Sequence, residues 1–228
     1  MPIARPKITV GEFYHVFNRG VEKRVIFPST SYYRRFVDGM LAFNTPRPVL
    51  MREFIKGIHT GVKPLYEGKR LVEIGAFALR PTHYHLLLRP VEDGGLSLFL
   101  QKLASGYTGF FNLKQRRVGS LFQGTFRIKH IDNDRYGRHI QAYIPLNTLD
   151  HAMPEWRERG IRDRERAKKI LRNDPWSSYG SYMGKNLFEG IIQPSFLKHC
   201  FDSPKEFESF VLSVTGDDVQ DIHGIVAG

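Results

Sequence analysis

The sequence predicts an α+β fold, a ferredoxin-like (RRM-like) split βαβ sandwich with a four- or five-stranded antiparallel sheet. The chain has 228 residues, of which 41% are hydrophobic and 25% charged, an ordinary composition for a globular protein. Segments with the period of strands and of helices follow one another as strand, helix, strand, strand, helix, strand, helix. The simplest fold for that order places the helices on one face of the sheet and leaves the other face open.

Aromatic and β-branched runs, helical spacing and turn residues define the individual elements. Four segments are predicted as strands: 12–20, 71–81, 83–90 and 120–131. Three segments are predicted as helices: 30–44, 96–117 and 133–151. Thr30 or Ser31 can cap the first of these helices, and Asn133 or Asp134 the last. Residues 48–59 are ambiguous and are compatible with a short helix.

The composition changes after residue 151, which predicts a domain over 1–151 and an extension over 152–228 that packs on it. Residues 155–174 are mostly charged with sparse apolar positions, a pattern typical of a solvated helix. Residues 175–184 are aromatic and rich in turn residues. Residues 203–216 are predicted as a short amphipathic helix.

The charge balance favours a polyanionic partner. The chain has 34 Lys and Arg against 23 Asp and Glu, a net charge of +11. Nucleic acid is the foremost partner for such a surplus, although a merely basic protein has the same balance. Cys200 is the single cysteine, which excludes an internal disulfide and a cysteine-based zinc cluster.

The same features bear on location. A single cysteine fits a reducing compartment. No segment approaches 18 consecutive apolar residues, and the N-terminus has no apolar core of signal-peptide length. We therefore expect a cytoplasmic protein, nucleoid-associated when bound to DNA, without a membrane partner.

Two histidines stand one residue apart in "RPTHYHLLLRP", residues 80–90. On a strand, His83 and His85 point to one face and Tyr84 to the other. Neutral imidazole is a ligand for divalent first-row metals, but two ligands rarely suffice. An exposed pair without a function is the alternative. A metal on an open sheet face of a basic protein favours phosphodiester chemistry.

Five segments, in this order along the chain, resemble the REP-associated tyrosine transposases: "YHVFNRG", "FALRPTHYHLLL", "GSLFQGTFRIKHI", "YIPLN" and "PWSSYGSYMG". That family belongs to the HUH single-tyrosine transposases, named after a His-hydrophobic-His motif. The resemblance runs from about residue 4 to residue 184. It implies a metal-dependent enzyme that cuts single-stranded DNA through a covalent 5′-phosphotyrosine and then transfers or rejoins the strand. The implied substrate is single-stranded DNA with a REP-like hairpin.

The resemblance also implies roles for particular residues. His83 and His85 match the metal-binding pair, Tyr143 the nucleophile, and Asn147 the third ligand of Mg²⁺ or Mn²⁺. Positions i and i+4 share a helix face, and a carboxamide oxygen is an acceptable ligand for these ions. Pro145 lies between the two positions and predicts that the helix kinks or ends there.

Other residues complete the prediction. Tyr107 also lies on a predicted helix, but its apolar neighbours favour a place in the core, so Tyr143 is preferred as nucleophile. Six basic residues are candidate contacts to DNA phosphates: Arg19, Arg116, Arg117, Arg127, Lys129 and Arg138.

Two other functions stay open. One is a non-catalytic nucleic-acid-binding module on the same sheet. The other is a metal-dependent nuclease that uses water and leaves no protein–DNA adduct. We expect a monomer, and a dimer is the alternative.

Overall fold

The sheet has the strand order expected for a split βαβ sandwich. The computed structural model describes residues 6–60, 69–185, 188, 190–193 and 195–219. The strands are β1 (Phe13–Arg19), β2 (Val72–Arg80), β3 (His83–Pro90) and β4 (Arg127–Ile131). They form an antiparallel sheet in the order β2-β3-β1-β4. The α+β class and the antiparallel sheet predicted from the sequence are therefore confirmed.

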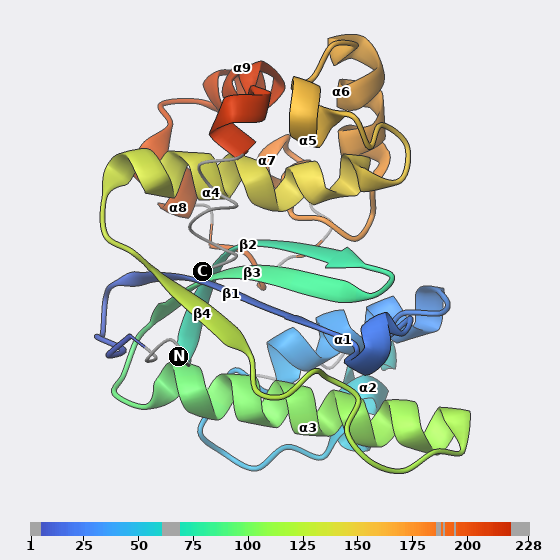
Figure 1. Cartoon of the computed structure of the whole chain (residues 1–228). Coiled ribbons are helices and arrows are strands. Elements are labelled where there is room, and N and C mark those ends of the chain that lie inside the picture. Colours follow the sequence, from blue (N-terminus) through green and yellow to red (C-terminus); the bar gives the residue numbers. More distant parts are fainter. Residues whose placement is uncertain (1–5, 61–68, 186–187, 189, 194, 220–228) are drawn as a thin grey trace.

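The helices lie on both faces of the sheet (Figure 1). Those before residue 151 are α1 (Thr30–Ala42), α2 (Met51–His59), α3 (Gly95–Gln115) and α4 (Asp134–Leu146), with 3₁₀ turns η1 (Val21–Lys23) and η2 (Asn147–Asp150). Those after it are α5 (Trp156–Arg159), α6 (Arg164–Asn173), α7 (Tyr179–Tyr182), α8 (Ser195–Cys200) and α9 (Pro204–Ser213). None of the helices in the described part of the chain is long and apolar enough to cross a membrane.

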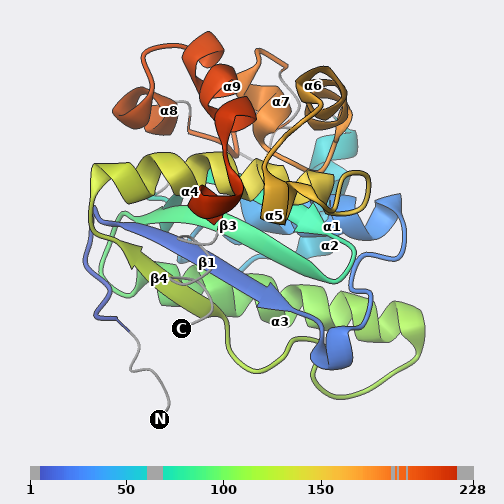
Figure 2. The ribbon, with the colours of Figure 1, turned by 45° about the horizontal axis from the view of Figure 1, so that its top comes forward.

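The two faces of the sheet are covered by different helices. The crossover helices α1 and α3 lie together on one face, as a split βαβ fold requires, while α4 lies across the other (Figures 1 and 2). The expectation that this second face is open is wrong, because the chain returns over it after β4. Alternation along β3 sends Tyr84 toward α1, where its ring lies 5.0 Å from Phe36, and sends His83 and His85 toward α4.

Strand β4 is shorter than predicted. The sequence predicts a strand over 120–131, but only Arg127–Ile131 pairs with β1. Gly124 has a φ of 70°, a left-handed conformation that interrupts an extended chain. The backbone before it pairs only through one isolated bridge, between Gly20 and Phe122. The consequence is a loop that carries Gln123 next to the start of β4.

Two helix predictions also need correction. The N-cap of α1 is Ser29, whose side chain caps no backbone N–H, so neither Thr30 nor Ser31 has that place. The charged stretch 155–174 forms two helices rather than one, because Gly160 ends α5 with a φ of 68°. Trp156 on α5 is fully buried, whereas α6 buries only Ala167 and Leu171 and exposes most of its charged residues, so the solvated helix is α6 alone.

The segments after α4 cover the outer edge of β2. The N–H of Leu79 donates to the Trp176 carbonyl at 2.9 Å, and the N–H of Gln193 donates to the Ile74 carbonyl at 3.0 Å. An unpaired strand edge is a site for aggregation, and covering it is a common protection. The extension thus contributes backbone hydrogen bonds to the sheet, whereas its separation from 1–151 as a domain stays a prediction.

We expect Asn44→Ala to destabilise the fold through the start of β2. Buried Asn44 accepts from the N–H groups of Leu71 and Val72 at 3.0 and 2.9 Å and donates to the Val72 carbonyl at 2.8 Å. Leaving buried backbone groups unpaired costs about 1–3 kcal/mol each, so we expect a loss of roughly 2–4 kcal/mol. Urea denaturation measures the loss. Exposed Asn173 at the end of α6 is the control, and a change of less than about 0.5 kcal/mol is expected for Asn173→Ala. Equal effects of the two substitutions would contradict the role given to Asn44.

Candidate active site

A pocket of about 250 Å³ lies where the His83 end of β3 faces the C-terminal end of α4. Six of the residues singled out in the sequence line it: Arg19, His83, His85, Arg127, Tyr143 and Asn147. Asp150 and Arg157, which the sequence analysis did not single out, line it as well. The pocket therefore brings together residues from β1, β3, β4, α4, η2 and α5.

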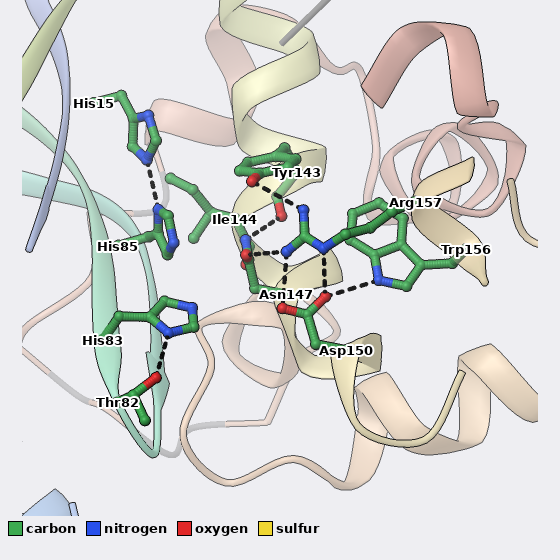
Figure 3. A network of polar contacts seen from close by, with 10 residues as sticks. All are labelled: His15, Thr82, His83, His85, Tyr143, Ile144, Asn147, Asp150, Trp156 and Arg157. Atoms are coloured by element: carbon green, nitrogen blue, oxygen red, sulfur yellow. Dashed lines mark hydrogen bonds and ion pairs between the residues drawn. The ribbon is translucent and has the colours of Figure 1, made fainter. Parts of the chain in front are cut away.

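The two histidines of the pocket have their Nδ1 atoms engaged. Their rings lie 5.2 Å apart and perpendicular to each other. The Nδ1 of His85 lies 2.9 Å from the Nε2 of His15, and the Nδ1 of His83 lies 3.1 Å from the Oγ1 of Thr82. Figure 3 shows the second nitrogen of each ring turned toward α4. Partners on Nδ1 that leave Nε2 for a ligand are the usual support of metal-binding histidines.

All three imidazoles are neutral at pH 7. Burial lowers the pKa of His83 to about 4, with Asp150 opposing the shift, and lowers the pKa of His15 to about 3. Burial, then the neighbouring His15 and His83, holds the pKa of His85 well below its usual value. The rings therefore keep the lone pairs that a metal ligand needs. His15 is a fully buried histidine that contacts the far side of His85 through its Nε2.

Tyr143 projects from α4 toward the histidines. Its ring centroid lies 6.0 Å from that of His85, and its side chain is almost completely buried. Its hydroxyl oxygen accepts a hydrogen bond from the Nη1 of Arg157 at 3.1 Å. Burial raises the pKa of Tyr143, and the adjacent Arg157 opposes that shift. Tyr107, by contrast, donates to the Ile26 carbonyl at 2.6 Å in the core between α1 and α3, as predicted.

Helix α4 ends one residue after Pro145. It ends at Leu146, and the chain tightens into the 3₁₀ turn η2. The Nδ2 of Asn147 donates back to the carbonyls of Tyr143 and Ile144 at 2.8 and 3.1 Å. These two bonds fix the orientation of the amide, so its Oδ1 is turned away from the helix. The predicted end of the helix is thus observed, yet Tyr143 and Asn147 still line one pocket.

An ion pair on the far wall of the pocket was missed by the sequence analysis. Asp150 accepts from the Nε and Nη2 of Arg157 at 2.9 and 2.8 Å, and from the indole N–H of Trp156 at 2.9 Å. Figure 3 shows this group beside Tyr143 and Asn147. Nothing in the spacing of residues predicts it, because it depends on how α5 folds back. The one available signal is Trp156, a large aromatic residue within a charged run.

The donors present fit a hard divalent cation. Within the described ranges, no three His, Cys, Asp or Glu side chains are grouped to hold a metal ion. The candidate set is instead two neutral imidazoles and one carboxamide oxygen, from His83, His85 and Asn147; the Asn147 Oδ1 accepts one hydrogen bond from Arg157 and keeps a second lone pair. Imidazole and carbonyl ligands suit Mn²⁺, and carbonyl and water ligands suit Mg²⁺. The pocket volume of about 250 Å³ leaves room for water or a substrate oxygen.

The predicted DNA contacts divide into two groups. Arg19 and Arg127 line the pocket. The others lie outside it. Arg138 donates to Glu206 and to the Cys200 carbonyl at 2.8 and 2.6 Å. Lys129 lies opposite His15 in the sheet register, and Arg116 and Arg117 follow the end of α3. Their contact with DNA stays a prediction.

Comparison with known proteins supports the fold. No protein-family model and no curated protein matches the sequence. A solved structure of a REP-associated tyrosine transposase bound to a REP hairpin is similar, with a TM-score of 0.53 and 16% identity. The similarity covers 85% of this chain and 92% of that one. At this identity it shows a shared fold, the α+β architecture with an antiparallel sheet.

Proposed function

We propose that the chain is a metal-dependent single-stranded DNA endonuclease and transposase with Tyr143 as its nucleophile. One observation carries the proposal: Tyr143, His83, His85 and Asn147 line one pocket, although they come from β3, from α4 and from the start of η2. A tyrosine hydroxyl beside candidate ligands of a divalent cation is the arrangement that a phosphotyrosine intermediate requires.

Charge and fold support a DNA substrate. The chain carries a net charge of +11, and Arg19 and Arg127 stand in the pocket wall. Arginine binds phosphate through its planar fork of N–H groups. The structural neighbour was solved with a REP hairpin, so we propose hairpin-bearing single-stranded DNA as the substrate. We propose a monomer as the acting form.

The residues of the pocket divide the work of the reaction. Arg19 and Arg127 bind the phosphates on either side of the scissile bond. The Tyr143 oxygen forms a bond to phosphorus, the bond from phosphorus to the 3′-oxygen breaks, and the phenol proton is transferred through water to that oxygen. The products are a 5′-phosphotyrosine and a free 3′-OH. His83, His85 and Asn147 would hold Mg²⁺ or Mn²⁺, which would supply charge stabilisation at the phosphate when bound.

The test is a covalent adduct assay with the purified chain. Hairpin-bearing single-stranded oligonucleotides, labelled at the 3′ end, are incubated with Mg²⁺ or Mn²⁺ and separated on a denaturing gel. We expect a labelled protein band that EDTA prevents. Hairpin binding unchanged by EDTA, without cleavage, would instead favour a non-catalytic binding module. Cleavage that leaves free 5′-phosphate ends would favour a nuclease that uses water.

A further inference from the structure

We propose that Arg157 is the positioning residue of the nucleophile: from outside α4, its guanidinium holds both the Tyr143 hydroxyl and the Asn147 amide oxygen. Its Nη1 donates to the Tyr143 oxygen at 3.1 Å and its Nη2 to the Asn147 Oδ1 at 2.9 Å. This inference rests on the proposed function, and it assigns a role to a residue beyond the metal ligands and the nucleophile.

Contacts outside α4 fix the position of the Arg157 guanidinium. Asp150 receives its Nε and Nη2 in a bidentate pair, at 2.9 and 2.8 Å. The indole N–H of buried Trp156 donates to the same carboxylate at 2.9 Å, and the Arg157 guanidinium lies 4.7 Å from the Trp156 ring centroid. Bidentate arginine–carboxylate pairs fix direction as well as distance. The remaining N–H groups of the guanidinium therefore point toward α4 in a fixed direction.

The alternative is a structural ion pair that touches Tyr143 incidentally. The bidentate pair with Asp150 is complete without Tyr143 or Asn147. Arg157 nevertheless reaches two positions four residues apart, Tyr143 on α4 and Asn147 at the start of η2, which are the two that the proposed reaction needs on one side. Because α4 ends at Leu146, the contacts of the Asn147 side chain with the helix are limited to those of its Nδ2 with the last turn. Arg157 fixes the other end of the amide by donating to its Oδ1.

The direction of the hydrogen bond between Arg157 and Tyr143 suits the proposed reaction. Guanidinium only donates hydrogen bonds, so the Tyr143 oxygen is the acceptor. During attack the phenol O–H bond breaks, a bond from oxygen to phosphorus forms, and the proton finishes on the departing 3′-oxygen. Arg157 keeps its protons throughout, since arginine is not deprotonated in proteins. Its hydrogen bond strengthens as negative charge gathers on the phenol oxygen.

The experiment compares Arg157→Gln with Arg159→Gln. Both substitutions remove one positive charge from α5, but Arg159 is exposed and outside the pocket. Single-turnover adduct formation is followed at saturating hairpin with Mn²⁺, and hairpin affinity is measured separately in EDTA. For Arg157→Gln we expect the rate to fall about 100-fold, in line with the loss of one preorganised donor at a reacting oxygen. We expect hairpin affinity within about threefold of wild type, because phosphate contacts elsewhere carry most of the binding.

Further variants guard against a folding defect. Arg157→Lys keeps the charge but lacks the planar fork whose separate nitrogens donate to Asp150, Tyr143 and Asn147, so we expect a smaller but clear loss of rate. Added guanidinium at millimolar concentration is expected to restore part of the rate of Arg157→Ala and to leave the rate of Arg159→Gln, which we expect to equal that of the wild type, unchanged.

The outcomes separate the two proposals. An unchanged rate in Arg157→Gln, with a wild-type adduct present, overturns the role of Arg157 alone. Absence of the adduct from the wild type overturns the proposed function and this role with it. Loss of hairpin affinity in EDTA equal to the loss of rate would make Arg157 a binding residue instead.

Discussion

Replacing Tyr143 with phenylalanine is expected to abolish the covalent protein–DNA adduct. The substitution removes the hydroxyl oxygen, which is the proposed nucleophile, and leaves a ring of nearly the same shape in the pocket. Arg157 loses one acceptor but keeps Asp150 and Asn147, so we expect a stability change of about 1 kcal/mol. A denaturing gel with labelled hairpin DNA measures the adduct, and thermal denaturation checks the fold.

Tyr136→Phe is the matched control for this substitution. Tyr136 lies on the same helix, two turns before Tyr143, and its buried hydroxyl has no hydrogen-bond partner among the described residues. Removing that hydroxyl is expected to leave adduct formation intact. An adduct from Tyr143→Phe at the wild-type rate would show that another nucleophile acts.

Replacing both His83 and His85 with alanine is expected to abolish the proposed binding of a divalent cation and the proposed cleavage that would depend on it. The two rings are neutral and turn one nitrogen toward α4, and the single amide oxygen of Asn147 cannot hold an ion alone. Since loss of supporting groups alone lowers metal affinity 10- to 100-fold, we expect a fall of more than about 100-fold. Mn²⁺ binding followed by electron paramagnetic resonance, in the absence of DNA, measures it.

His130→Ala is the control for the loss of a histidine. His130 lies on β4 outside the pocket, where it contacts Glu12 at 3.2 Å. We expect Mn²⁺ affinity within about twofold of wild type for this variant, as for surface substitutions in general. Undiminished Mn²⁺ binding by the double His83 and His85 variant would contradict the proposed ligand set. Binding lost equally in His130→Ala would point to a general defect.

Local patterns were enough to predict most of the sheet and the histidine pair. The alternation of "HYHLLL" in β3 places Tyr84 toward α1 and His83 and His85 toward the opposite face, because the period of a strand is two. The capping of α4 by Asn133, whose side chain accepts from the Tyr136 N–H at 2.8 Å, is equally local. The spacing of Tyr143 and Asn147 predicted a common side of the helix, and both line the pocket.

Features that depend on tertiary contacts were not predictable from the sequence. The charged run does not indicate that the Arg157 side chain points into the pocket. Its contacts with Asp150 and Tyr143 depend on how the chain folds back after η2. The closed second face of the sheet has the same origin, since periodicity gives the length of α4 but not the surface on which it lies. β4 is shorter than predicted because Gly124 has a left-handed backbone conformation, and the strand-like composition of residues 120–131 does not reveal that conformation.

The most direct measurement is to locate the covalent bond itself. The adduct formed by the wild-type chain with hairpin DNA and Mn²⁺ is digested with nuclease and protease, and the nucleotide-bearing peptide is sequenced by mass spectrometry. The account predicts that the nucleotide is attached through its 5′-phosphate to Tyr143. A nucleotide attached to any other residue, or cleaved DNA with a free 5′-phosphate and no modified peptide, would contradict it.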